Sequence, residues 1–247
     1  MKLPFHGDLL RAPHKKYQET VVLVHFYGAR KSSLKRHIEW LNEIGYDCVF
    51  FELLDTPKKV KTFLFSSQLN FGIKNIWTDQ IEAILNTIPG KKIIFSFSNP
   101  SAAAIAAIVR RGAFDISALI CEGGPSGDLW KSFYNYFTYE QPLKFYPLIA
   151  GAATLTNILW HPHSNEQLQH AVAQLPQSFP ILSIRGWKDP LISPQMIDKV
   201  FEKHSHLDWQ KLSLPLGGHL NGLKDFPHEY KPAVEQFMKE HATSERQ

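Results

Sequence analysis

The sequence has 247 residues, of which 44% are hydrophobic and 20% are charged, the ordinary proportions of a globular protein. A chain of this length can bury a full core, so we expect a single domain over residues 1–247. The net charge of +4 comes from lysines and arginines scattered along the chain. This pattern indicates a solvated surface and argues against a nucleic-acid partner.

Strand and helix patterns alternate along the chain from residue 19 onward. The predicted strands are Glu19–Phe26, Asp47–Leu53, Lys91–Ser98, Ile116–Glu122, Pro180–Arg185 and Asp208–Leu214. The predicted helices are Lys31–Ile44, Lys74–Ile88, Asn99–Arg111, Pro194–His204 and His228–His241. Residues 54–73 are predicted to form a loop, and residues 3–18 a short antiparallel hairpin at the sheet edge. Nearly continuous apolar strands separated by helices indicate an α/β fold, a mostly parallel sheet with helices on both faces.

An aromatic-rich segment of about residues 125–176 interrupts this alternation. Its aromatic residues are Trp130, Phe133, Tyr134, Tyr136, Phe137, Tyr139, Phe145, Tyr146 and Trp160. A helical insertion at this point would cover the carboxyl ends of the strands, where ligands bind in open α/β sheets. The rings could equally seal the insertion onto the core, and the two interpretations are compatible.

The longest uncharged run, Phe145–Trp160, contains 16 residues and is interrupted by proline and glycine. A bilayer span needs about 20 predominantly apolar residues, so we expect no transmembrane segment and instead a buried or lid-like helix. Cys48 and Cys121 lie in strands that should not be neighbours, which predicts two free, buried thiols. Free thiols fit a reducing compartment, and the N-terminus lacks an apolar signal region. We therefore expect a cytoplasmic location.

Between Lys91 and Arg110 a short apolar strand pattern ends in small polar residues and turns directly into an alanine-rich helix pattern. A serine at such a junction sits on a sharp turn, which exposes its hydroxyl and points the following backbone N–H groups at the reacting atom. Ser98 occupies this junction and is the predicted acyl acceptor. Ser96 and Ser101 are rivals, but they should lie inside the strand and the helix, where their hydroxyls point less well.

Acyl transfer by a serine also needs a base and a carboxylate that orients the base. His219 follows the last predicted strand on a glycine-rich loop, and Asp189 lies on a loop directly after a buried strand. All three residues therefore fall at carboxyl ends of predicted strands, in the order nucleophile, acid, base. Glu122, which ends another strand, is the alternative orienting carboxylate.

Three segments, together with the turn at Ser98, carry a resemblance to a known family. They are Val21–Gly28 (VVLVHFYG), Gly186–Pro190 (GWKDP) and Gly218-His219. They resemble, in turn, the strand ending in a His-Gly loop, the acid loop and the terminal histidine of the α/β-hydrolase superfamily. The resemblance covers about residues 19–241 and implies an α/β-hydrolase fold with a helical cap.

The same resemblance implies an oxyanion hole. One backbone N–H would come from Tyr27, or from Phe26, and the other from Asn99. His25 is expected to be a structural hydrogen-bonding residue beneath this loop. The family's Gly-x-Ser-x-Gly motif reads SFSNP here over residues 96–100, without either glycine. Ser96 at the first glycine position is small, and Pro100 at the second is tolerated because proline fits the first turn of a helix. Both replacements are therefore compatible with the turn.

Two histidine pairs, His161/His163 and His204/His206, lack a carboxylate or cysteine at ligand spacing and are interpreted as solvent-exposed. The sequence has no glycine-rich phosphate loop after a strand and no dinucleotide fingerprint. We therefore infer no metal and no cofactor.

These observations favour a serine hydrolase that acts on a carboxylic ester or thioester with an apolar group, through an acyl-enzyme on Ser98. The partner would be a small-molecule acyl substrate. The alternatives are a non-catalytic binding protein with this fold, favoured by the loss of both motif glycines, and an acyltransferase on the same fold. The sequence leaves the exact substrate and the oligomeric state open.

Overall fold

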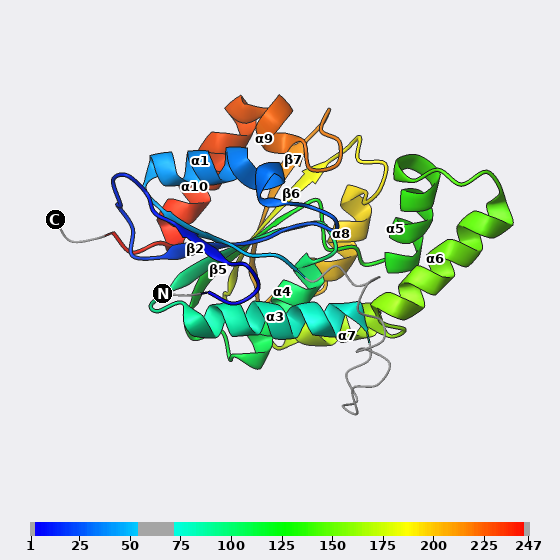
Figure 1. Ribbon diagram of the computed structural model, residues 1–247, viewed down its shortest axis with the longest axis horizontal. Helices are drawn as coiled ribbons and strands as arrows, with labels where there is room; N and C mark the ends of the chain where they lie inside the picture. The colour runs from blue at the N-terminus through cyan, green and yellow to red at the C-terminus, as the bar shows by residue number, and fades with distance from the viewer. Residues whose placement is uncertain (1–2, 54–71, 245–247) are drawn as a thin grey trace.

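A computed structural model describes residues 3–53 and 72–244 of the chain. Its strands form one seven-stranded sheet in the order β1-β3-β2-β4-β5-β6-β7 (Figure 1). The strands are β1 (Asp8–Leu10), β2 (Thr20–Val24), β3 (Asp47–Phe50), β4 (Lys92–Phe97), β5 (Ile116–Glu122), β6 (Pro180–Gly186) and β7 (Asp208–Leu214). All neighbouring strands are parallel except β1, which runs antiparallel to β3. The predicted α/β class is confirmed.

Helices cover both faces of the sheet. One face carries α1 (Lys35–Ile44), preceded by the short 3-10 helix η1 (Lys31–Leu34), together with α9 (Gly222–Asp225) and α10 (Pro227–His241). The other face carries α3 (Ile73–Thr87), α4 (Ser101–Arg110), α7 (Ser164–Ala173) and α8 (Pro194–Phe201). Alternate residues of the interior strand β2 point to opposite faces, so Val22 packs in one core and Val21 in the other. The strands are thereby buried on both faces, which explains why their sequences are nearly unbroken apolar runs.

The edge of the sheet differs from the sequence prediction. Residues 3–18 contribute one three-residue strand, β1, instead of the predicted hairpin. Leu9 of β1 is paired with Val49 of β3. The edge strand therefore pairs with a strand of the main sheet and not with a second strand from residues 3–18. The predicted loop at residues 54–73 lies almost wholly outside the described residues.

Cys48 and Cys121 are both buried and free, as predicted. They lie on β3 and β5, which are separated by β2 and β4. Burial raises the pKa of both thiols, that of Cys121 to about 12. The thiols therefore remain protonated and pack as small apolar groups.

Three consecutive segments stand away from the sheet at the right of Figure 1, and we call them the projecting helices. They are α5 (Leu129–Asn135), the π-helix η3 (Tyr136–Glu140) and α6 (Tyr146–Trp160). The last helix of the predicted insertion, α7, instead packs back onto the body, where Leu168 and Val172 join the core beneath α4.

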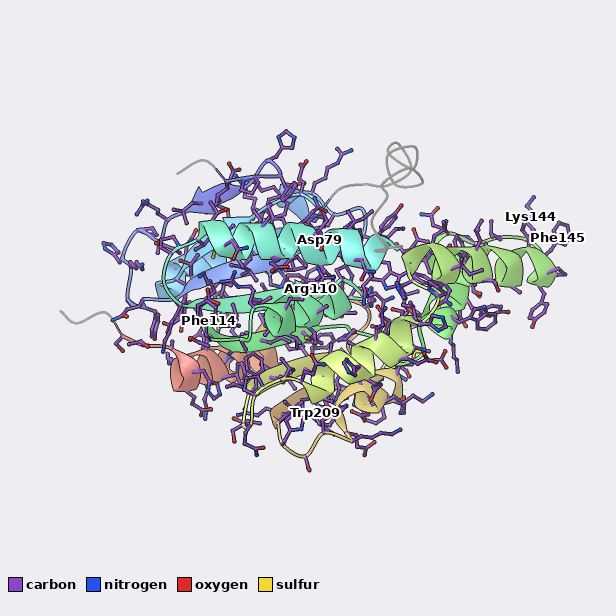
Figure 2. The ribbon with its side chains drawn as sticks, turned by 90° about the horizontal axis from the view of Figure 1, so that it is seen from below. Asp79, Arg110, Phe114, Lys144, Phe145 and Trp209 are labelled. Atoms are coloured by element: carbon purple, nitrogen blue, oxygen red, sulfur yellow. The ribbon has the colours of Figure 1, made fainter. Side chains whose placement is uncertain are left out.

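The aromatic residues of the projecting helices have different surroundings, and only some of them seal these helices onto the core. Trp160 packs the base of the projecting helices onto the core. Its ring centroid lies 5.1 Å from that of the buried Trp77 on α3. Phe145 lies at the far tip, where Figure 2 shows it beside Lys144, and it is 67% exposed. Although α6 is apolar, it has 15 residues, and no helix in the described part of the chain is long and apolar enough to cross a membrane.

A buried charge cluster joins the starts of β4 and β5. The ammonium group of Lys92 lies 2.6 Å from a carboxylate oxygen of Asp115, and Arg111 donates to the same oxygen. Burial raises the pKa of Asp115, but the hydrogen bonds from Lys92 and Arg111 outweigh burial and lower it overall. Asp115 therefore stabilises the fold above the ordinary aspartate pKa, and this contribution is lost as the pH falls through the lowered value.

Replacing Asp115 by alanine should lower the free energy of unfolding by about 3–5 kcal/mol, because it leaves a buried ammonium group without its counter-charge. Asp79, which pairs with Arg110 on the outer surface of α3 and α4 (Figure 2), gives the control. Asp79→Ala should cost less than about 1 kcal/mol. Urea unfolding of both variants measures the difference, and equal midpoints would contradict the assigned role.

Candidate active site

Ser98 follows the last residue of β4 and has a left-handed backbone, with φ of 57°. Two hydrogen bonds hold this conformation. The Ser98 N–H donates to the Glu122 carbonyl at 2.8 Å, and the Ser98 carbonyl accepts from the Ser101 N–H at 3.1 Å. A strand, a strained serine and a helix in direct succession form the geometry of a nucleophile elbow. Ser96 and Ser101 are both fully buried, as expected for residues within the strand and the helix.

The space that the elbow needs is provided by the neighbouring strand. A Cβ atom on Gly124, which follows β5, would lie 2.3 Å from the Ser98 carbonyl oxygen. Real Cβ atoms essentially never come this close to backbone, so the close approach requires glycine at position 124. The glycines missing around Ser98 are thus offset by a glycine across the sheet. Sequence analysis missed Gly124, although the Gly123-Gly124 pair directly after a strand was the available signal.

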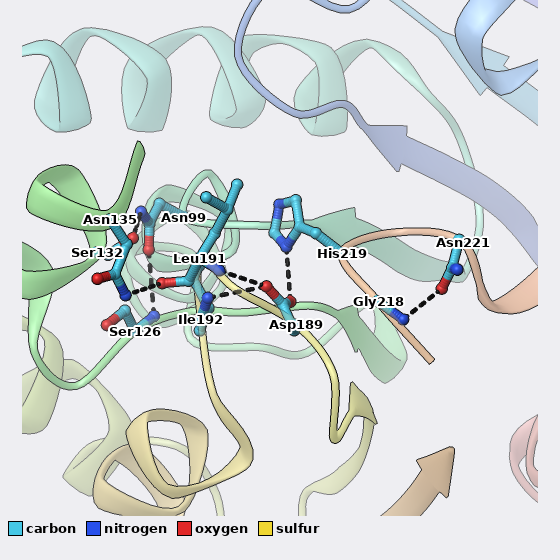
Figure 3. Close-up of polar contacts among 10 residues, drawn as sticks. All are labelled: Asn99, Ser126, Ser132, Asn135, Asp189, Leu191, Ile192, Gly218, His219 and Asn221. Atoms are coloured by element: carbon cyan, nitrogen blue, oxygen red, sulfur yellow. Dashed lines mark hydrogen bonds and ion pairs between the residues drawn. The ribbon is translucent and has the colours of Figure 1, made fainter. Parts of the chain in front are cut away.

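His219 and Asp189 are joined by a hydrogen bond of 2.7 Å between His219 Nδ1 and Asp189 Oδ2 (Figure 3). The other carboxylate oxygen of Asp189 accepts the N–H groups of Leu191 at 2.8 Å and Ile192 at 3.0 Å. The Asp189 side chain is 1% exposed and that of His219 is 18% exposed. A buried carboxylate on Nδ1 leaves Nε2 free to accept a proton, the tautomer that a general base needs.

Glu122 has other partners. Its carboxylate accepts the Tyr230 hydroxyl at 2.5 Å and lies 3.3 Å from His37 Nε2, beneath α1 and α10. Burial, together with the Glu122 charge, raises the pKa of Tyr230 well above its usual range. The carboxylate next to His219 is therefore Asp189 and not Glu122.

His25 fixes the loop after β2 through two hydrogen bonds. Its Nε2 accepts the Leu53 N–H at 2.9 Å, so Nδ1 carries the proton and donates to the Phe26 carbonyl at 2.6 Å. Burial lowers the pKa of His25, which keeps the ring neutral in this arrangement. The loop with the two candidate oxyanion residues Phe26 and Tyr27 is thereby fixed at its first residue.

The same loop and the elbow face a common cavity of about 1380 Å³. Ser98, Asn99, His219, Phe26 and Tyr27 all line it, so the predicted site residues converge on one space, with Asp189 directly behind His219. The N–H groups of Phe26 and Asn99 have no acceptor within residues 3–53 and 72–244. Among the residues that the structure describes, no hydrogen bond of 3.5 Å or less joins Ser98 to His219; catalytic hydrogen bonds often tighten only when substrate binds.

The projecting helices form the far wall of the cavity. Their contribution is largely apolar or aromatic and includes Phe133, Tyr136, Phe137, Leu159 and Trp160, and Leu143 adds to it from the connection between η3 and α6. On the opposite side the wall is formed by Leu34, Phe97 and Leu220. The cavity is therefore suited to a ligand with an apolar group.

One interpretation of the histidine pairs is wrong. His161 is buried and not solvent-exposed, because α7 packs back onto the body, and its ring is held between the His163 N–H and Gln167 of α7. Burial lowers its pKa. Among the described residues, no group of three or more His, Cys, Asp or Glu side chains could hold a metal ion.

Comparison with solved structures identifies the fold. An esterase of Pyrococcus furiosus matches with a TM-score of 0.68 at 14% identity, covering 98% of this chain and 92% of that one. A monoacylglycerol lipase of Paleococcus ferrophilus matches at 0.64 and 15%, covering 98% and 100%. A meta-cleavage product hydrolase of Pseudomonas fluorescens matches at 0.64 and 15%, covering 95% and 93%. The sequence matches no protein-family model and no curated protein. The chain has the α/β-hydrolase fold, as its sequence resemblance implied.

Gly124→Ala should displace the Ser98 carbonyl and lower the free energy of unfolding by about 1–3 kcal/mol, the usual range for overpacking. Gly151 on α6 provides a matched control, because a Cβ there meets no atom within 4 Å. Gly151→Ala should be neutral or add up to about 1 kcal/mol, since alanine favours helix. Urea unfolding compares the two, and an unaffected Gly124→Ala protein would show that the elbow does not need this glycine.

Proposed function

We propose that this protein is a serine hydrolase that cleaves carboxylic esters or thioesters bearing an apolar group. The observation that carries the proposal is the hydrogen bond between Asp189 and His219, located on the same cavity as the strained Ser98. A buried carboxylate on one nitrogen of a histidine, beside a serine on a sharp turn, is the arrangement that activates a hydroxyl group.

In the proposed reaction, Ser98 Oγ attacks the substrate carbonyl carbon while His219 Nε2 takes the hydroxyl proton. The negative oxygen of the tetrahedral intermediate accepts hydrogen bonds from the N–H of Asn99 and from that of Tyr27 or Phe26. The intermediate collapses, the carbon–oxygen or carbon–sulfur bond breaks, and His219 returns the proton to the leaving group. The acyl group is then an ester of Ser98.

Deacylation repeats these steps with water. His219 takes a proton from the water, which attacks the acyl carbonyl, and Ser98 Oγ leaves with that proton. Asp189 keeps its charge throughout and stabilises the imidazolium that forms twice in each cycle. An acyltransferase would follow the same path with another acceptor in place of water.

The substrate class follows from the cavity wall. The projecting helices place aromatic and aliphatic side chains opposite Ser98, and we propose that they act as a cap over an apolar acyl or alcohol group. Similar solved structures include proteins described as an esterase and a monoacylglycerol lipase. Their names agree with an ester substrate.

The non-catalytic alternative was favoured by the loss of both glycines around Ser98. The left-handed backbone of Ser98 and the space at Gly124 support the hydrolase instead, because the turn has a sharp, exposed geometry without those glycines. The left-handed conformation of Ser98 costs on the order of 1–2 kcal/mol, and the hydrolase proposal accounts for this cost because the conformation exposes the hydroxyl group.

The first test is covalent labelling of Ser98. A fluorophosphonate probe should label the wild-type protein at Ser98, and Ser98→Ala should abolish labelling and lower kcat for a nitrophenyl ester by about 10⁴-fold or more. Ser101→Ala is the matched control, since Ser101 is a buried serine in the next helical turn, and it should stay labelled. An unlabelled wild-type protein without esterase activity would favour the binding-protein alternative.

The second test concerns the apolar wall. For nitrophenyl esters from acetyl to octanoyl, kcat/KM should rise by up to about fourfold per methylene, because each buried methylene contributes about 0.8 kcal/mol. Leu159→Gln in the cavity wall should flatten this dependence, whereas Leu148→Gln, an exposed leucine on the same helix, should not. A fall in kcat/KM with chain length would contradict the proposed substrate class.

A further inference from the structure

Two polar side chains on α5, Ser132 and Asn135, contact the loops of the candidate active site. They lie three residues apart and therefore share one face of the helix. The N-terminus of α5 is capped by Asp128, whose carboxylate accepts the Lys131 N–H at 3.2 Å. Figure 3 shows Ser132 and Asn135 beside Asn99 and Leu191.

Ser132 contacts the elbow. The Asn99 side-chain amide donates to Ser132 Oγ at 3.0 Å, and its oxygen accepts the Ser126 N–H at 3.2 Å. Because a backbone N–H can only donate, the amide oxygen must face Ser126, and the amide nitrogen must face Ser132. Asn99, Ser126 and Ser132 are all buried. Breaking one of these hydrogen bonds would therefore leave a buried polar group without a partner, which is unfavourable in free energy. The residue directly after the proposed nucleophile is thus held by the middle of α5 and by the loop that precedes this helix.

Asn135 contacts the acid loop. Its side-chain amide donates to the Leu191 carbonyl at 3.1 Å, while the Leu191 N–H donates to Asp189 Oδ1 at 2.8 Å. One residue, Leu191, therefore links α5 to the carboxylate that orients His219.

We propose that Ser132 and Asn135 are positioning residues, which make α5 a brace between the oxyanion hole and the acid loop. This inference rests on the proposed hydrolase function. Ser132 fixes the N–H of Asn99 relative to Ser98, and Asn135 fixes Asp189 relative to His219. Neither side chain takes part in proton transfer, and both act through the residue that they contact.

Ser132→Ala and Asn135→Ala should each lower kcat for nitrophenyl acetate by about 10-fold to 100-fold, since small displacements in an active site have effects of this size. KM for this small substrate should change less than twofold, because the apolar wall stays intact. The second-order rate of fluorophosphonate labelling should fall in parallel with kcat. Ser132→Thr keeps the hydroxyl and should restore most of the rate.

Lys131→Ala is the matched control, because its side chain on the same helix is exposed. It should keep kcat and the labelling rate within twofold of the wild-type values. The positioning role of α5 is contradicted if Lys131→Ala lowers kcat as much as Asn135→Ala does. It is also contradicted if Ser132→Ala and Asn135→Ala both keep the wild-type kcat.

A readout that needs no activity separates this inference from the proposed function. The proton on His219 Nδ1, bonded to Asp189, should give a downfield NMR resonance in the wild-type protein. Asn135→Ala should shift or broaden this resonance, and Lys131→Ala should leave it unchanged. An unlabelled wild-type protein without esterase activity would end the hydrolase proposal, whereas an unchanged resonance in Asn135→Ala would end the proposal for Asn135 even if Ser98 is labelled.

Discussion

The left-handed backbone of Ser98 is the constraint on which the rest of the site depends. A serine in this conformation is disfavoured by about 1–2 kcal/mol, so the surrounding structure has to hold it. It does so through the bond from the Ser98 N–H to the Glu122 carbonyl and through the space above Gly124. Both come from β5 and the residues that follow it. The elbow is therefore a product of two neighbouring strands and not of its own motif.

The two carboxylates near this edge of the sheet have separate environments. Asp189 accepts hydrogen bonds from two backbone N–H groups and from His219 Nδ1. The other ring nitrogen of His219, Nε2, is thereby left free to exchange protons. Glu122 is enclosed by Tyr230 and His37 on the other side of β5. This separation gives the candidate base one orienting partner, and it assigns Glu122 to the core between α1 and α10.

Much of this arrangement could be predicted from the sequence. The strands Ile116–Glu122 and Asp208–Leu214 were predicted with the bounds that they have, because each is an uninterrupted strand pattern between clear turns. Residues directly after such strands must meet at one edge of a parallel sheet, which is why Ser98, Asp189 and His219 could be named together. The order of the apolar runs was sufficient for the fold class.

Other features depend on contacts between distant segments and leave no local pattern. The strand β1 has only three residues and exists through its pairing with β3. His161 is buried because α7 folds back onto the body, a docking that the sequence of α7 does not reveal. The role of Gly124 depends on the backbone of Ser98, and Ser132 and Asn135 gain theirs from loops that follow other strands.

The most direct measurement is a crystal structure of the protein after reaction with an alkyl phosphonate. We predict a covalent bond from phosphorus to Ser98 Oγ, with the phosphoryl oxygen about 2.7–3.1 Å from the Asn99 N–H and from the N–H of Tyr27 or Phe26. His219 Nε2 should lie within hydrogen-bonding distance of the adduct, and the alkyl group should lie against the projecting helices. A phosphonate on another residue, or one on Ser98 whose oxygen points away from Asn99, would contradict this account.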